Sequence, residues 1–271
     1  MKKILVCFMI FNMFGVFPLF GAEYKLSMLP RYFPEKLIVM ITPLASYLSK
    51  KTGLKIVPVL TKNFADYRAR ILLNRDIAIG YENPMVYVKI SSAHEAIATA
   101  IKGAGGDRFR GIVITRPDSG ITQLSFLKGK KVMIVGKTSA GGYLSQKLTL
   151  QNMGIDVDHD CHLSVAADNR QENVIISVSI GDVDAGFIRE SALHKADQFI
   201  QPGSVVSVAE TAWLPNWALS VDKGLPVSIK HSIQKAVLDL QKDSEVLKAM
   251  GLSSFVRATD SDYNVMRKLV H

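Results

Sequence analysis

The segment at residues 135–142 (VGKTSAGG) places a lysine, two hydroxyl residues and three glycines directly before an apolar helical pattern. Its Gly136-Lys137-Thr138 has the form of the end of a P-loop. A P-loop, however, needs its first glycine five residues before the glycine that precedes the lysine, and Lys131 occupies that position. The spacing therefore excludes a P-loop nucleotide site.

A simpler anion site remains compatible with this segment. The pattern predicts a strand over 131–135, a loop of small residues, and a helix over 143–152. A helix that begins after Gly142 presents unpaired N–H groups, the positive end of its dipole, and the hydroxyls of Thr138 and Ser139. The alternative is an ordinary strand-to-helix turn that Ser139 caps. The segment alone leaves both interpretations open.

The other reactive residues do not form a known catalytic or metal-binding pattern. The run His159-Asp160-Cys161-His162 lacks the Cys-x-x-Cys and His-x-x-x-His spacings of metal sites. The chain contains no Gly-x-Ser-x-Gly nucleophile elbow. Of its two cysteines, Cys7 lies in the apolar N-terminal run, which leaves Cys161 without a disulfide partner. We therefore expect no metal, no cofactor and no catalysis, so the protein is predicted not to be an enzyme.

The N-terminus has the layout of a secretory signal. Lys2 and Lys3 precede an apolar run over residues 4–20, and the chain turns polar at Glu23. Residues 1–22 are therefore predicted to be a signal peptide, and the mature protein to be exported to the periplasm. The residues around positions 21 and 22 match the small-residue pattern of a signal cleavage site only in part. An uncleaved membrane anchor is therefore an alternative. No later run is long and apolar enough to span a bilayer.

The chain is moderately basic, with a formal net charge of +9. The basic residues are spread along the chain without a Lys/Arg run. This distribution suits attraction of a small anion better than a nucleic-acid groove, so no nucleic acid is expected as a partner.

Hydrophobic periodicity predicts two α/β units, each with a parallel sheet covered by helices. Leu37, Met40, Ile41, Leu44 and Leu48 share one face of the first helical region, and Pro43 predicts a kink there or a division into two helices. Strands are expected over 24–29, 54–60, 76–80, 96–101, 111–115, 132–135, 162–165, 185–187 and 217–221; helices over 35–51, 64–74, 172–180, 227–242 and 244–250, and after residues 84 and 142.

Two units joined by more than one crossing strand would enclose a cleft at the carboxyl ends of their strands. We expect a first lobe over 23–114, a second lobe over 115–212, and a return to the first lobe over 213–271. Hinge strands are expected near 111–115 and 215–221.

Several segments, taken in order, resemble the periplasmic substrate-binding proteins of phosphate, phosphite and phosphonate ABC transporters, the PhnD-like group of the type 2 periplasmic-binding-protein fold. They are 43–53 (PLASYLSKKTG), 76–84 (DIAIGYENP) with 87–88 (YV), 111–121 (GIVITRPDSGI), 127–130 (LKGK) and 181–186 (GDVDAG). The resemblance covers essentially the whole exported part. It implies two α/β lobes joined by hinge strands, with a ligand cleft between them.

The resemblance also implies which residues hold the ligand. In this family the loop before the helix binds the oxyanion, and the matching positions are Thr138, Ser139, Ala140, Gly141 and Gly142. Ala140 and Gly141 stand where the family pattern usually has hydroxyl residues, so backbone N–H groups would do more of the binding, and either the affinity is lower or the anion differs.

Further ligand residues are expected in both lobes. In the facing lobe, Tyr81 and Asn83 follow a strand and precede a helix, which directs them into the cleft, and Tyr87 lies one turn further along. Asp184 is expected to line the cleft from a helix-to-strand turn of the second lobe. The resemblance adds Phe64, at a position that is often aromatic in the family, and Glu172, which resembles an acidic ligand residue of the family. Helix-to-sheet packing is the alternative role for Phe64 and Tyr87, and satisfying its own helix start is the alternative for Glu172. Arg189 and Trp213 are lesser candidates.

The function that the resemblance implies is extracytoplasmic capture of a small oxyanion, with phosphonate, phosphite or phosphate as the expected ligand, and its delivery to an ABC transporter permease. The protein is expected to act as a monomer and to meet the membrane only through the transporter or an uncleaved signal anchor. An exported sensor of the same fold, which reports a small anion to a membrane receptor, is the alternative function.

Overall fold

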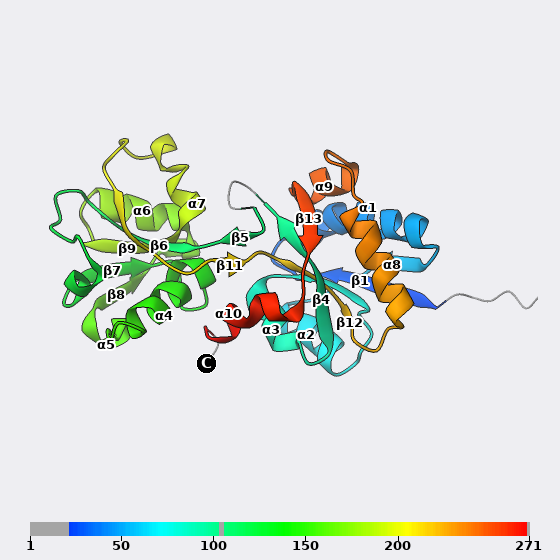
Figure 1. The fold of residues 1–271 in the computed structure, drawn as a ribbon. Coiled ribbons are helices and arrows are strands. Elements are labelled where there is room, and N and C mark those ends of the chain that lie inside the picture. Colours follow the sequence, from blue (N-terminus) through cyan, green and yellow to red (C-terminus); the bar gives the residue numbers. More distant parts are fainter. Residues whose placement is uncertain (1–21, 103–105, 270–271) are drawn as a thin grey trace, which may run out of the picture.

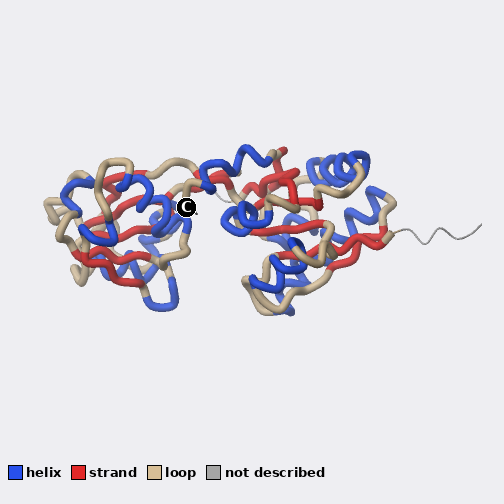
Figure 2. Tube along the Cα trace, turned by 90° about the horizontal axis from the view of Figure 1, so that it is seen from below, coloured by secondary structure: helices blue, strands red, loops and turns tan. Residues whose placement is uncertain are grey.

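The computed structural model describes residues 22–102 and 106–269. The predicted signal peptide at 1–22 lies, but for its last residue, outside the described residues. Figures 1 and 2 show two separate α/β bodies that the chain links through short extended segments. Among the helices that the structure describes, none is both long and apolar enough to cross a membrane.

Lobe 1 is built on a mixed sheet of six strands in the order β13-β4-β12-β3-β1-β2. Strands β1, β2 and β3 run parallel to one another, whereas β12 is antiparallel to both β3 and β4. The purely parallel sheet expected from the sequence is therefore wrong, because the strand that returns from the second lobe enters the sheet in the opposite direction. The strands are β1 (Glu23–Met28), β2 (Lys55–Pro58), β3 (Ile79–Glu82), β4 (His94–Ile101), β12 (Ala218–Asp222) and β13 (Ser254–Arg257).

Helices cover both faces of this sheet. Helices α1, α8 and α9 bury their apolar residues against one face, and α2, α3 and α10 pack on the other. The helices are α1 (Pro34–Thr52), α2 (Phe64–Leu72), α3 (Pro84–Ile90), α8 (Val227–Leu238), α9 (Glu245–Met250) and α10 (Asn264–Arg267).

Helix α1 contains the apolar face predicted from the sequence, and all five of its residues are buried. It begins with Pro34 in its first turn and ends at Gly53, whose φ of 72° terminates the helix in the left-handed region. The expected division at Pro43 is not observed, because α1 runs continuously through this residue. Buried residues on both sides of Pro43 hold the two halves against the sheet, which outweighs the missing backbone hydrogen bond.

Lobe 2 is a five-stranded sheet in the order β10-β6-β9-β7-β8. Its apolar residues form one core toward α4 and α5 and another toward α6 and α7. The elements are β6 (Gly111–Thr115), β7 (Lys131–Ile134), α4 (Ser145–Gln151), α5 (Val157–Asp160), β8 (His162–Val165), α6 (Gln171–Ser179), β9 (Ala185–Arg189), α7 (Glu190–Leu193) and β10 (Val206–Glu210).

The chain crosses between the lobes at two short strands that pair with each other, β5 (Arg108–Phe109) and β11 (Leu214–Pro215). This differs from the expected boundary after residue 114 and the expected hinge over 111–115, because β6 pairs with β9 and β10 inside the lobe 2 sheet. Asn216 ties the two crossings together, since its backbone N–H donates to the Asp107 carbonyl at 2.8 Å and its side-chain amide donates to the Gly106 carbonyl at 2.8 Å.

A buried polar cluster lies inside lobe 1 around Gly80. The Tyr67 hydroxyl donates to the Glu82 carboxyl at 2.6 Å. His94 Nε2 is 3.0 Å from the Ile77 carbonyl, which can only accept, so Nδ1 accepts from the Ser220 hydroxyl at 2.8 Å. A Cβ at Gly80 would lie 2.6 Å from both the Glu82 carboxyl and the Tyr67 hydroxyl, so only glycine fits there.

Burial shifts the pKa values of Glu82 and His94 in opposite directions. Desolvation raises the pKa of Glu82 to about 7 and lowers the pKa of His94 to about 4. Between about pH 4.5 and 7 the folded state keeps a proton on Glu82 that the unfolded state releases, so this contribution to stability is lost as the pH rises. Between about pH 4 and 6.5 the unfolded state binds a proton that folded His94 does not, so this contribution grows as the pH rises.

We expect Glu82→Gln and His94→Gln to have opposite effects on the pH dependence of stability. From pH 4.5 to 7, the free energy of unfolding of Glu82→Gln should rise relative to that of the unsubstituted protein, by up to about 3 kcal/mol. That of His94→Gln should fall relative to it over a similar range. Urea unfolding at four pH values measures both, with the exposed Glu35→Gln as the matched control. Parallel curves for all four proteins would contradict the assignment.

Candidate anion site between the lobes

A cavity of about 460 Å³ lies between the lobes, beside the crossing segments. Among the described residues, its lining carries six arginine or lysine side chains but only one carboxylate, that of Glu190. Lobe 1 contributes Met28, Arg31, Tyr32, Met40, Tyr81, Lys102, Trp217 and Met250; lobe 2 contributes Arg110, Arg189, Glu190, Ser191, His194 and Lys195; the crossings and the residues beside them contribute Arg108, Phe109, Trp213 and Asn216. The composition of this lining favours an anionic ligand.

Arg189, at the carboxyl end of β9, is the most deeply placed cation of the cavity. Its guanidinium lies over the Phe109 ring at 4.2 Å and donates to the Asn216 side chain at 3.3 Å. Its Nε is buried and has no hydrogen-bond partner among the described residues. Desolvation, together with the nearby charge of Arg31, lowers the pKa of Arg189 to about 10, so the side chain stays charged at neutral pH. A buried charged donor without a partner is suited to bind an oxyanion.

Arg31 provides a cation from the opposite lobe. It follows β1, where the Leu29 N–H donates to the Tyr81 carbonyl at 2.9 Å and the Arg31 N–H donates to the Leu29 carbonyl at 2.8 Å. Its guanidinium lies between two aromatic rings, 5.2 Å from the centre of Tyr32 and 5.3 Å from that of Trp217. These cation–π contacts hold the side chain at the cavity without neutralising its charge.

Arg110 is different, because carboxylates already neutralise it. Both oxygens of Glu190 accept from its guanidinium, at 2.9 and 2.6 Å, and Glu210 accepts from the remaining nitrogen. The guanidinium also lies 4.6 Å from the centre of the Trp213 ring. Hydrogen bonding to Arg110 lowers the pKa of Glu190, so this carboxylate is ionised and committed to its arginine.

Tyr81 is one of the residues predicted from the sequence that lines the cavity. Strand register places it opposite Met28 of β1 and Leu219 of β12, and its ring lies 5.0 Å from that of Trp217. The lesser candidates Arg189 and Trp213 line the cavity as well.

The predicted anion loop borders the cavity without lining it. Ser139 caps the helix start, since its hydroxyl accepts from the Gly142 N–H at 3.1 Å. The chain then forms one π-helical turn, Ala140–Leu144, before α4. A Cβ on Gly141 would lie 3.1 Å from the Phe109 ring and 3.3 Å from the Arg189 Cβ, so the loop packs directly behind the arginine. Whether Thr138 to Gly142 bind an anion stays a prediction.

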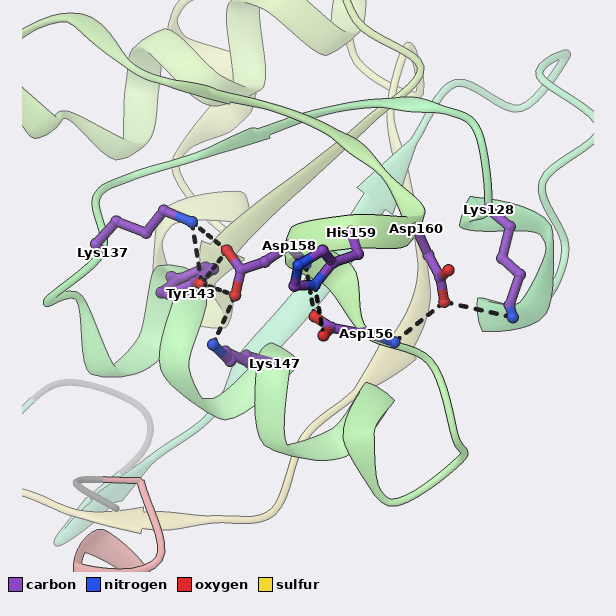
Figure 3. Close-up of polar contacts among 8 residues, drawn as sticks. All are labelled: Lys128, Lys137, Tyr143, Lys147, Asp156, Asp158, His159 and Asp160. Atoms are coloured by element: carbon purple, nitrogen blue, oxygen red, sulfur yellow. Dashed lines mark hydrogen bonds and ion pairs between the residues drawn. The ribbon is translucent and has the colours of Figure 1, made fainter.

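Lys137, the residue that suggested a P-loop, is engaged elsewhere. Figure 3 shows Lys137, Tyr143 and Lys147 converging on Asp158 of α5. Asp158 accepts from Lys137, from the Tyr143 hydroxyl at 2.6 Å and from Lys147 at 2.6 Å. Burial acts to raise the pKa of Asp158, but these hydrogen bonds outweigh it and hold the pKa well below the ordinary value. The cluster fixes the loop and the start of α4 to α5.

The neighbouring His159-Asp160-Cys161-His162 run directs its side chains to separate partners. His159 pairs with Asp156 at 2.7 Å and Asp160 with Lys128 at 3.3 Å, as Figure 3 also shows. The buried Cys161 thiol donates to the Leu127 carbonyl at 3.2 Å, and burial raises its pKa to about 11.

Five other predicted ligand residues do not line this cavity, within the part of the chain that the structure describes. Asn83 caps α3 by accepting from the Val86 N–H at 2.8 Å. The buried Tyr87 hydroxyl donates to Asp260 at 2.6 Å and accepts from the Ala96 N–H at 3.0 Å.

The remaining three residues are Phe64, Glu172 and Asp184. Phe64 is exposed at the start of α2, and Glu172 is exposed in the first turn of α6. The Asp184 carboxylate accepts from the Lys131 N–H at 2.8 Å.

Sequence reasoning missed Arg31, Phe109, Arg110, Asn216 and Trp217. A signal for Arg31 was available, because it follows the carboxyl end of a predicted strand, as Tyr81 does. Phe109, Asn216 and Trp217 reach the cavity only because the two crossings pair with each other, which no local pattern predicts.

Ser139→Ala separates the two roles of the loop. Loss of the cap should lower the free energy of unfolding by about 1 kcal/mol, measured by urea denaturation. We expect the affinity for phosphate or methylphosphonate to fall by less than about threefold, because Ser139 does not line the cavity. Thr149→Ser, which keeps the hydroxyl bonded to the Ser145 carbonyl in α4, is the control. A loss of affinity above tenfold would instead identify the loop as the main anion site.

Solved structures of the same fold include several binding proteins at low sequence identity. PhnD1 from Prochlorococcus marinus, in complex with methylphosphonate, is 14% identical with a TM-score of 0.64, and the match covers 91% of this chain and 96% of that one. XAC2383 from Xanthomonas citri, bound to ATP, is 16% identical with a TM-score of 0.71 over 92% and 96% of the two chains. PA3383 from Pseudomonas aeruginosa, a binding protein component of an ABC phosphonate transporter, is 15% identical with a TM-score of 0.61 over 92% and 86%.

The family comparison covers nearly the whole described chain. The family described as "ABC transporter, phosphonate, periplasmic substrate-binding protein" matches residues 26–263, which include both lobes, both crossings and every residue that lines the cavity. The protein therefore belongs to the periplasmic phosphonate-binding proteins of ABC transporters.

Proposed function

We propose that this protein captures a phosphonate or a related phosphorus oxyanion in the cavity between its lobes and delivers it to an ABC transporter permease. The observation that carries the proposal is the Arg189 side chain, which lines the cavity, has a buried Nε without a hydrogen-bond partner among the described residues, and lies opposite Arg31 of the other lobe. An anion that is attracted to two cations on opposite lobes draws the lobes together. Binding and release require no bond to be made or broken.

The location and partners are part of the same proposal. Family membership supports a periplasmic protein that a signal at residues 1–22 exports, and a permease that receives the ligand from the closed form. We propose a monomer, because the cavity is formed by the two lobes of a single chain. The methylphosphonate of the PhnD1 complex supports the ligand class, and the ATP of the XAC2383 complex makes a larger phosphate compound a useful comparison.

Calorimetric titration of the protein from Glu23 onward, stripped of ligand by unfolding and refolding, tests the ligand class. The panel is phosphate, methylphosphonate, ethylphosphonate, ATP, sulfate and acetate. We expect a phosphorus oxyanion to bind and acetate not to bind. Absence of binding for every phosphorus compound would contradict the proposed function.

Arg189→Gln tests the site. The affinity for the bound phosphorus oxyanion should fall by at least about 30-fold, because loss of one partner of a buried charged hydrogen bond costs roughly 2 kcal/mol or more. The exposed Arg170→Gln, also in lobe 2, is the matched control and should bind within twofold of the unsubstituted protein. Unchanged affinity in Arg189→Gln would place the anion elsewhere.

Intrinsic fluorescence offers an independent readout, because both tryptophans of the chain line the cavity. Trp217 contacts Arg31 and Trp213 contacts Arg110, so movement of either arginine changes the surroundings of an indole. We expect the ligand to change the emission of the unsubstituted protein. Trp217→Phe should lose the larger part of that change, because Arg110 remains fixed to Glu190 while Arg31 is free to move to the anion. A calorimetric signal without any change in emission would contradict a site between the two indoles.

A further inference from the structure

The proposed function does not specify which phosphorus oxyanions the cavity selects. The charged side chains of the cavity lining indicate which ones it favours. Within the part of the chain that the structure describes, the carboxylate of Glu190 is the one acid in the lining, and both of its oxygens are used by Arg110. A ligand that carries an ammonium group would therefore find no free carboxylate there. It would instead place a third positive charge beside Arg31 and Arg189, at a cost that grows as the cavity closes and excludes water.

Arg31 and Arg189 differ from Arg110 in how they are held. Among the described residues, neither has a carboxylate within ion-pair distance. Aromatic rings hold both: Tyr32 and Trp217 for Arg31, and Phe109 for Arg189. The two guanidinium groups keep their full charge and their free donors, one in each lobe.

Two like charges on opposite walls of one cavity repel each other. The interaction reaches across the cavity, because the charge of Arg31 contributes, after desolvation, to lowering the pKa of Arg189. Closure shortens the distance between the two groups and removes water from between them, which strengthens the repulsion. Lys102, Arg108 and Lys195 add further positive charge to the lining. A dianion therefore offsets more of the repulsion between Arg31 and Arg189 than a monoanion does.

We propose that the cavity is specific for amine-free dianions, namely alkylphosphonates or phosphates in their doubly ionised form, which bridge Arg31 of lobe 1 and Arg189 of lobe 2. The same pair opposes closure of the empty cavity. Arg31 is then the residue that couples ligand charge to lobe closure, and its role rests on the proposed function.

A series of ligands of nearly equal size tests the specificity. Ethylphosphonate, 2-aminoethylphosphonate, the monomethyl ester of ethylphosphonate, and ethanesulfonate are titrated by calorimetry at pH 8.5, where the phosphonates that can ionise twice do so. We expect ethylphosphonate to bind at least tenfold more tightly than each of the other three. Equal or tighter binding of the aminoethyl compound, or of the monoanions, would overturn the proposal while leaving the proposed function intact. Binding of none of the phosphorus compounds would overturn both.

Arg31→Gln tests the coupling. We expect this variant to prefer ethylphosphonate over its monomethyl ester by less than about threefold. Its ligand-free radius of gyration, measured by X-ray scattering, should shift toward that of the liganded protein. Arg31→Lys, which keeps the charge, and Arg170→Gln should retain the preference and the open form. Because Arg31 is exposed, the variant should unfold at the same urea concentration as the unsubstituted protein. An unchanged preference together with an unchanged radius of gyration in Arg31→Gln would overturn the role of Arg31.

Discussion

The cavity between the lobes depends on one electrostatic constraint: Arg189 is a largely desolvated cation that no carboxylate of the described chain neutralises. Removing a charge from water without a counterion is costly, and the nearby Arg31 adds to the cost. The fold compensates only in part, with the face of Phe109 and the side-chain oxygen of Asn216. What remains uncompensated is available to a ligand. The cost of binding an anion is thus lowered, because part of the desolvation of Arg189 has already taken place in the ligand-free protein.

The same contacts link this cation to the crossings between the lobes. Phe109 belongs to β5, and Asn216 directly follows β11, so Arg189 rests on both segments that join the lobes. Each lobe has its own hydrophobic core, and the paired crossings are short. An anion that binds to Arg189 therefore acts at the crossings between the lobes, where little apolar surface resists movement. In lobe 1, by contrast, the polar cluster of Glu82 and His94 is buried within the sheet and its covering helices, where Glu82 keeps its proton up to about pH 7 and His94 stays neutral above about pH 4.

Local patterns predicted the elements better than the site. The apolar face of α1, the strand at 162–165 and the helix after Asn83 are all present, because their periodicity and capping residues determine them locally. The antiparallel β12 and β13, and the pairing of β5 with β11, depend on segments more than a hundred residues apart in sequence, and no local pattern encodes them. For the same reason Tyr81 could be placed at the cleft and Asn216 only within an expected hinge strand, whereas Phe109 could not be placed there.

Lys137 shows why a motif has to be read with its nearest countercharge. In Gly136-Lys137-Thr138 the lysine looks available for a phosphate, but Asp158 of α5 accepts from it, from Lys147 and from Tyr143. The Asp158 carboxylate thus neutralises two cations on that side of the loop, so that they are not available to a bound anion. The same ion pairs hold the start of α4. Glu190 does the same to Arg110 within the cavity. Arg31 and Arg189 are the arginines of the lining that aromatic rings hold in place of acids, and this difference in partner distinguishes them from Arg110.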